Sequence, residues 1–180
     1  MNEARMIAYR IETATLDDLP GIIALFDDAL AWLTQRGITG QWGTTPFSAL
    51  PTMREHFGAL IDRGAMFVAR SDHGLIGTVA VGPHVPAYAL PVVEGLLGVA
   101  YYLEALATAR RHKGHAIGQA LLRWAESRAR QQGASYLRLD CWAGNPALCA
   151  YYEREGFAPL ARFDVGDWQG QLFEKGLDPR

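Results

Sequence analysis

The segment Lys113–Gly118 carries the residue types of an anion-binding turn. It reads Lys-Gly-His-Ala-Ile-Gly and lies between an apolar run and an amphipathic run that is typical of a helix. Backbone N–H groups in the first turn of a helix have no partner within the helix, and glycine lets a phosphate approach them closely. The glycine spacing fits neither a P-loop nor a dinucleotide-binding fingerprint. The segment therefore indicates either an anion site or an ordinary turn between a strand and a helix.

A second segment, which begins at Asn145, could supply a proton donor. Asn145 and Pro146 are typical of the first positions of a helix, and Gly156 is typical of the residue that follows its end. A tyrosine hydroxyl on that helix, with a pKa of about 10, can donate a hydrogen bond or a proton to a reacting group. The alternative is a plain short helix whose Tyr151 or Tyr152 packs in the core.

The elements that must position these segments follow from hydrophobic periodicity and from turn residues. Strands are predicted at residues 6–13, 66–69, 75–81, 98–108, 136–141, 157–165 and 168–175. Helices are predicted from Thr15 to about Arg36 and at residues 50–63, 115–132 and 146–155. Residues 82–97 are rich in proline and glycine and are predicted to form a loop, which at this length is often functional. The order of elements predicts a mixed α/β fold.

Composition limits the class of protein. The chain has 180 residues, 49% hydrophobic and 20% charged, so we expect one globular domain over residues 1–180. With 17 Lys and Arg against 19 Asp and Glu, the net charge is −2 and indicates no nucleic-acid partner. The two cysteines lack the spacing of a metal site, and no run is apolar enough for a membrane helix. Because residues 1–5 also lack the apolar run of a signal peptide, we expect a cytoplasmic protein without a metal or a membrane partner.

Taken together and in this order, the two segments resemble the GNAT superfamily of N-acetyltransferases. In that family a strand ending Leu-x-Val precedes a glycine-containing loop, a helix with Leu-Leu, a strand, an Asn and a helix ending Tyr-Glu-x-x-Gly-Phe. The matching stretches here are Leu106-Ala107-Thr108, the loop at 113–118, Leu121-Leu122, Leu137-Arg138-Leu139-Asp140, Asn145 and Tyr152-Glu153-Arg154-Glu155-Gly156-Phe157. The resemblance covers nearly the whole chain. It implies an α/β (α+β) fold with a central mixed, mostly antiparallel sheet flanked by helices.

The resemblance implies that acetyl-CoA is the donor. It assigns the pyrophosphate to the main-chain N–H groups of Lys113, Gly114, His115, Ala116, Ile117 and Gly118. It assigns the pantetheine amides to strand-like pairing with Leu106, Ala107 and Thr108. Asn145 would contact the pantetheine arm or cap the helix below it. Lys113 stands where the family has Arg or Gln and Ala116 where it has Gly, and Ala116 suits a phosphate contact if its φ is negative.

Acetyl transfer to an amine needs a proton donor and a proton acceptor. The resemblance implies that Tyr152 faces the sulfur and donates to the departing thiolate, whereas Tyr151, about 100° around the helix, is expected to pack. Glu104 is the candidate base, directly or through water. Period-two alternation puts it on the same strand face as Leu106 and Thr108. The alternative is a glutamate that orients the acceptor or forms a salt bridge.

Acceptor specificity is expected in residues 32–47 and in the loop at 82–97. The aromatic residues Trp32, Trp42 and Phe47 could line an apolar or cationic pocket, and the alternative is a small satellite core under a loop. The mildly negative charge favours a cationic small-molecule or peptide amine, and a homodimer would follow from the habit of the family. Cys141 and Cys149 are expected to fill space in the core.

The sequence favours an acetyl-CoA-dependent N-acetyltransferase that works by direct attack of the amine in a ternary complex. Two alternatives belong to other classes of protein. One is a catalytically silent acyl-CoA-binding or interaction module on the same fold. The other is a different phosphate-binding α/β module that takes a nucleotide.

Overall fold

The computed structural model describes residues 7–177 and contains a seven-stranded mixed, mostly antiparallel sheet flanked by helices. The strand order is β1-β2-β3-β4-β5-β7-β6. The strands are β1 (Tyr9–Thr13), β2 (Met66–Ser71), β3 (Gly74–Gly82), β4 (Ala100–Thr108), β5 (Tyr136–Trp142), β6 (Ala158–Val165) and β7 (Trp168–Gly176). The α-helices are α1 (Leu19–Thr34), α2 (Pro51–Asp62), α3 (Leu90–Val93), α4 (Ile117–Gln131) and α5 (Pro146–Arg154). This sheet confirms the predicted fold class.

In the described part of the chain, short 3-10 segments accompany these elements: η1 (Leu16–Asp18), η2 (Phe47–Ala49), η3 (Ala87–Ala89) and η4 (Arg110–His112). Within residues 7–177, the helices are too short or too polar to cross a bilayer.

The chain forms two compact units that interleave along the sequence. Unit 1 contains the chain up to Gly37 together with Thr44–Ala80 and Ala105–Arg123. Unit 2 contains Ile38–Gly43, Val81–Glu104 and the chain from Trp124 onward. Strand β4 and helix α4 each contribute residues to both units. A single domain over residues 1–180 stays a prediction.

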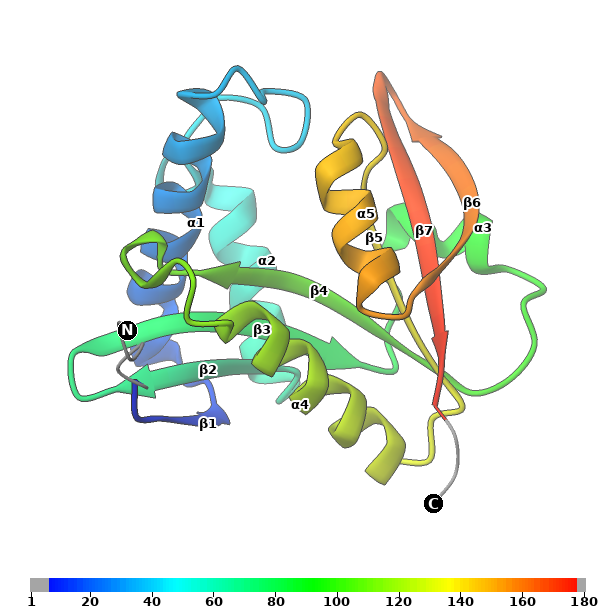
Figure 1. Cartoon of the computed structure of the whole chain (residues 1–180), viewed down its shortest axis with the longest axis horizontal. Coiled ribbons are helices and arrows are strands. Elements are labelled where there is room, and N and C mark those ends of the chain that lie inside the picture. The colour runs from blue at the N-terminus through cyan, green and yellow to red at the C-terminus, as the bar shows by residue number, and fades with distance from the viewer. Residues whose placement is uncertain (1–6, 178–180) are drawn as a thin grey trace, which may run out of the picture. The chain divides into compact units, whose positions relative to one another are not determined.

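In unit 1, helices α1 and α2 contact each other (Figure 1). The predicted apolar stripe of α1 is buried at Leu19, Ile22, Ile23, Phe26, Leu30 and Leu33. Burial of such a stripe supplies most of the stability of a helix in a protein. Gly37, with a φ of +70°, follows the end of the helix as predicted. Strands β1, β2 and β3 pair antiparallel, from Tyr9↔Ser71 in the first pair to Met66↔Ala80 in the second.

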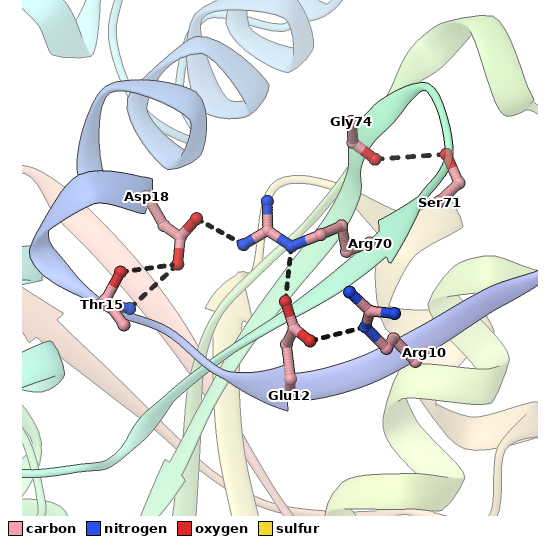
Figure 2. Close-up of polar contacts among 7 residues, drawn as sticks. All are labelled: Arg10, Glu12, Thr15, Asp18, Arg70, Ser71 and Gly74. Carbon is pink, nitrogen blue, oxygen red and sulfur yellow. Dashed lines mark hydrogen bonds and ion pairs between the residues drawn. The ribbon is translucent and has the colours of Figure 1, made fainter.

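A network of charged side chains joins β1, β2 and η1 within unit 1 (Figure 2). Arg70 donates to Asp18 at 2.6 Å and also to Glu12, which accepts a further hydrogen bond from Arg10 at 2.8 Å. Asp18 also accepts from the N–H of Thr15 at 3.0 Å and from its hydroxyl at 3.2 Å. Burial alone would raise the pKa of Asp18, but the hydrogen bonds from Arg70 and Thr15 outweigh it and lower the pKa.

In unit 2, β5, β7 and β6 form an antiparallel ladder with α5 alongside β5 and β7 (Figure 1). The parallel pairing of β4 with β5 runs from Ala100↔Tyr136 to Tyr102↔Arg138. The ring of Tyr152 packs 5.8 Å from that of Phe173 and 6.1 Å from that of Phe157. These contacts fix α5 on the sheet of its own unit.

The structure differs from the predicted elements in two places. Residues 82–97 contain η3 and α3, because Pro86 is the N-cap of η3 and Pro91 lies in the first turn of α3, where proline is compatible with a helix. Helix α4 begins at Ile117 and not at residue 115. Met6 of the first predicted strand and residues 1–5, on which the expectation of no signal peptide was based, lie outside the described residues.

Candidate functional site

The segment predicted to bind a pyrophosphate is an exposed turn at the N-terminus of α4 in unit 1. The side chains of residues 113–116 are exposed, and Ile117 is buried and anchors the turn. Gly114 has a φ of +88°, and a Cβ added to it would meet no atom within 4 Å. The carbonyl of Ala116 accepts the first helical hydrogen bond, from the N–H of Ala120 at 2.9 Å. The N–H groups that follow Ala116 therefore belong to the first turn of a helix, and the turn fits an anion.

The condition set for a phosphate contact at Ala116, a negative φ, is not met. Its φ is +53°, in the left-handed region that favours glycine. Ala116 is the last residue before α4. The GNAT pattern has glycine at this position, which adopts that φ without the cost of about 1–2 kcal/mol that an alanine bears.

Two of the basic residues before this turn contact other parts of unit 1. The guanidinium group of Arg110 lies 3.8 Å from the ring centre of Trp32, and Arg36 lies over the same ring at 4.1 Å. The N–H of Arg110 donates to Asp28 at 3.0 Å, and Arg111 donates to the carbonyl of Leu75 at 3.1 Å. Trp32, predicted to line an acceptor pocket, thus forms cation–π contacts between α1 and η4.

Phe47 and Trp42, the other aromatic residues predicted for acceptor binding, lie in different units. Phe47 is buried in unit 1, with ring centres 5.0 Å from Phe26 and 6.2 Å from Phe57. This position agrees with the packing alternative for Phe47. Trp42 is half-buried in unit 2, next to Gln41, whose side-chain oxygen accepts from the Asn145 amide at 3.0 Å.

Asn145 caps α5, one of its two predicted roles. Its Oδ1 accepts from the N–H of Leu148 at 3.2 Å while its amide group binds Gln41. Trp142 packs closely beneath this region, because a Cβ added to Gly40 or Gly144 would lie within 2.3 Å of its ring. The contact of Asn145 with a pantetheine arm stays a prediction.

Strand β4 contains a second left-handed alanine, Ala105, also with a φ of +53°. A left-handed residue inside a strand interrupts the alternation of side chains, as in a β-bulge. The period-two assumption that put Glu104, Leu106 and Thr108 on one face is therefore wrong at this point. Glu104 belongs to unit 2, whereas Leu106, Ala107 and Thr108 belong to unit 1, beyond the parallel pairing with β5.

Tyr152 is 7% exposed and lies in the core of unit 2. Burial, and then the neighbouring Cys141 and Tyr151, raise its pKa, so the hydroxyl is protonated at neutral pH. Cys141 and Cys149 are free thiols whose sulfur atoms lie 3.7 Å apart, Cys141 being buried and Cys149 half-buried.

The sequence analysis missed Asp140 as a functional candidate. Its Oδ1 accepts hydrogen bonds from the hydroxyls of Tyr102 and Tyr88, the latter at 3.1 Å. Glu104 is near enough to raise the pKa of Asp140, after the larger effect of burial. The sequence did contain a signal for Asp140, because it lies between Leu139 and Cys141 in a strand predicted to be part of the core. A charged residue in such a position is uncommon unless it has a partner or a function.

Residues 24–157 match the model of the Acetyltransferase (GNAT) family, a span that includes both the turn before α4 and helix α5. The chain therefore belongs to the GNAT family and is an acetyl-CoA acyltransferase.

Individual relatives agree with this assignment. The chain is 30% identical to the uncharacterized N-acetyltransferase YesJ of Bacillus subtilis (strain 168), across 96% of this chain and 98% of that protein. It is 28% identical to the L-methionine sulfoximine/L-methionine sulfone acetyltransferase of Pseudomonas paraeruginosa, across 94% and 95% of the two chains. The fold resembles that of the PaiA N-acetyltransferase from Thermoplasma acidophilum in complex with coenzyme A, with a TM-score of 0.72, 20% identity and coverage of 94% and 99%.

Proposed function

We propose that this protein transfers an acetyl group from acetyl-CoA to a primary amine by direct attack in a ternary complex. The observation that carries the proposal is the turn Lys113–Gly118, exposed at residues 113–116, which leads into the first turn of α4 at Ile117 and Gly118. The N–H groups of Lys113 and His115 donate to the carbonyls of Arg110 and His112, so the N–H groups at the start of α4 are the ones offered to the phosphates. The presence of coenzyme A in the structure of the PaiA neighbour supports this donor. In the proposal, Leu106, Ala107 and Thr108 pair with the pantetheine amides, and Asn145 caps α5 or contacts the arm.

The amine must lose a proton before it attacks. Near neutral pH, an alkylammonium group with a pKa of about 10.4 leaves roughly one molecule in 10³ neutral. Glu104 accepts this proton, directly or through water. The nitrogen then attacks the thioester carbonyl carbon, a C–N bond forms, and the C–S bond breaks as the thiolate leaves. Main-chain N–H groups near Leu106–Thr108 polarise the carbonyl.

Tyr152 is the proposed donor to the departing thiolate. Because burial raises its pKa above the ordinary value, the phenol keeps its proton at neutral pH. A thiol has a pKa of about 8.5, so a phenol with a higher pKa stabilises the thiolate by hydrogen bonding more readily than by losing its proton completely. Charge-assisted hydrogen bonds of this kind are about twice as strong as neutral ones.

The acceptor in this proposal is a small-molecule or peptide amine. The Pseudomonas relative, named for L-methionine sulfoximine and L-methionine sulfone, supports a small acceptor. Trp32 and Trp42 stay candidates for contacts with it, whereas the burial of Phe47 favours packing. A cytoplasmic location and a homodimer stay predictions from the sequence.

The Tyr152→Phe variant tests the assigned chemistry. We expect kcat to fall about 10- to 100-fold, while the Kd for acetyl-CoA stays within about twofold of wild type. Turnover is measured as thiol release with a panel of polyamines, amino acids, aminoglycosides and peptide N-termini, and affinity by isothermal titration. Tyr151→Phe, one residue away on the same helix, is the matched control and should keep wild-type turnover. Full turnover in Tyr152→Phe would remove Tyr152 from the mechanism, and absence of acetyl-CoA binding by wild type would overturn the function.

A further inference from the structure

A half-buried carboxylate in unit 2, that of Asp140 in β5, accepts hydrogen bonds from two tyrosine hydroxyls. Tyr88 of η3 donates to its Oδ1 at 3.1 Å, and Tyr102 of β4 donates to the same oxygen. The parallel register pairs Tyr102 with Arg138, so Asp140, two residues further along β5, projects to the same face as Tyr102. Leu172 of β7 lies opposite Asp140. The carboxylate is therefore surrounded by three elements of one unit.

Asp140 has no cationic partner among residues 7–177. The arginine of the same strand, Arg138, donates instead to Glu174 at 2.7 Å and to the carbonyl of Leu97 at 3.3 Å. Partial burial of a carboxylate without a counter-charge disfavours its charged form unless hydrogen bonds offset the lost solvation. Asp140 thus accepts hydrogen bonds from two hydroxyl groups and is also suited to accept a proton.

The pKa of Asp140 agrees with this view. Burial raises it, the hydroxyls of Tyr102 and Tyr88 lower it, Glu104 raises it again, and the net shift is upward. The titratable groups that interact with Asp140 from the surrounding elements are Tyr88 of η3, Tyr102 and Glu104 of β4, Cys141 of β5 and Tyr152 of α5. Each of these groups is neutral or anionic, so none favours the charged carboxylate through its own charge.

Of the two tyrosines that donate to Asp140, Tyr88 is the one at the surface. Tyr88 is 43% exposed, whereas Tyr102 is 2% exposed. The Tyr88 ring stacks on Phe163 at 6.3 Å and meets the edge of Trp168 at 6.5 Å, which holds the ring while its hydroxyl reaches inward. A proton can therefore pass between the outside of unit 2 and Asp140 through the Tyr88 hydroxyl.

An ammonium acceptor loses two protons in becoming an amide, one before it attacks and one after the C–N bond forms. In the proposed function Glu104 accepts the first. Building on that function, we propose that Asp140 accepts the second through the hydroxyl of Tyr88. The N–H bond breaks, the Tyr88 oxygen takes this proton, and the original Tyr88 proton passes to Asp140, so Tyr88 stays neutral. Over the whole reaction the ammonium group loses two protons and the coenzyme A thiolate gains one. The remaining proton is released to water after the products leave.

A pair of matched variants tests the relay, because Tyr88→Phe and Tyr102→Phe each remove one hydroxyl from the same carboxylate. With an amine that the wild type acetylates, we expect Tyr88→Phe to lower kcat about 10- to 100-fold, with the Kd for acetyl-CoA within about twofold of wild type. The loss should be at least about tenfold greater than that in Tyr102→Phe. A purely structural role for Asp140 predicts equal losses, or a larger loss in the buried Tyr102→Phe, and either result would overturn the relay. A wild type that acetylates no amine would overturn the proposed function as well.

A titration of Asp140 gives an independent readout. NMR of the full chain, labelled at the aspartate carboxyl carbons and assigned with Asp140→Asn, should give Asp140 a pKa above the ordinary range of aspartates. Tyr88→Phe should raise this pKa further, since it removes a donor to the charged form. A wild-type pKa at or below the ordinary value of about 3.9 would overturn the inference even if an activity variant failed to fold.

Discussion

At the scale of single residues, two alanines carry backbone strain beside the groups assigned to acetyl-CoA. Ala105 precedes Leu106, and Ala116 lies within the turn Lys113–Gly118, each with a φ of +53°. A left-handed alanine costs about 1–2 kcal/mol and persists only where the surrounding structure holds it. Strained residues are common at ligand sites. Variants at both positions can therefore show whether a change affects the stability of the fold or the binding of acetyl-CoA.

Two substitutions in the turn before α4, at Gly114 and Ala116, are expected to affect the free energy of unfolding differently. Gly114→Ala adds a Cβ to a residue with a φ of +88° and should lower the free energy of unfolding by about 1–2 kcal/mol and weaken acetyl-CoA binding. Ala116→Gly relieves the strain but adds entropy to the unfolded chain, so stability should stay constant or rise by up to about 1 kcal/mol.

Chemical denaturation and isothermal titration with acetyl-CoA measure both effects. Ala116→Gly serves as the control, because it alters the same turn without adding an atom. Stronger binding by Gly114→Ala than by wild type would contradict the role given to this turn.

Patterns in the sequence predicted the residues of the candidate site that lie close together in the chain, but not those that the fold brings together. Asn145 and Tyr152 were found because they lie within one short motif, and the cap at Asn145 follows from local chemistry. Tyr88 and Asp140 are 52 residues apart, so nothing local in the chain joins them. The left-handed conformations of Ala105 and Ala116 were missed because only glycine signals such a φ in a sequence.

At the scale of elements, most boundaries follow from chemistry at their ends. Pro51 begins α2, Gly37 follows α1, and the Gly166–Asp167 turn joins β6 to β7. The short helices η3 and α3 were missed because prolines and glycines also dominate ordinary loops. That error mattered, since η3 contains Tyr88, whose hydroxyl donates to Asp140 of β5.

The Arg70 network gives a prediction for the pH dependence of stability. The pKa values of Asp18 and Glu12 are lowered in the folded protein, that of Glu12 chiefly by Arg70 and Arg10. The unfolded state therefore binds more protons, and the stabilisation is complete above the unfolded pKa values of about 4 and is lost as pH falls below them. Arg70→Met should lower the free energy of unfolding near neutral pH by about 1 kcal/mol through the loss of its hydrogen bond to the buried Asp18.

Urea denaturation at several pH values between about 3 and 7 measures this effect. The difference between wild type and Arg70→Met should shrink progressively as pH falls below about 4, because the two carboxyls take up protons first in the unfolded state and then, at their lowered pKa values, in the folded wild type. Arg10→Met, which removes the exposed partner of Glu12 alone, is the control and should show a smaller difference. A difference that stays constant over the whole range would contradict the ion-pair origin of the stabilisation.

At the scale of the whole molecule, the assigned roles are divided between the two units. Unit 1 contains the turn before α4 and the Leu106–Thr108 end of β4, which are assigned to the donor. Unit 2 contains Glu104, Tyr152, Tyr88 and Asp140, which are assigned to proton transfer. The GNAT assignment spans residues 24–157 and so includes residues of both units, which makes the full chain the right material for kinetic tests.

The central claim is direct acetyl transfer from acetyl-CoA to an amine, and initial-velocity kinetics of thiol release test it most directly. Acetyl-CoA and an amine from the panel are varied together, and the product is identified by mass spectrometry. The account predicts intersecting reciprocal plots, one acetylated amine for each thiol released, and no acetylated protein. Parallel plots with an isolable acetyl-enzyme, or thiol release that no amine accelerates, would contradict it.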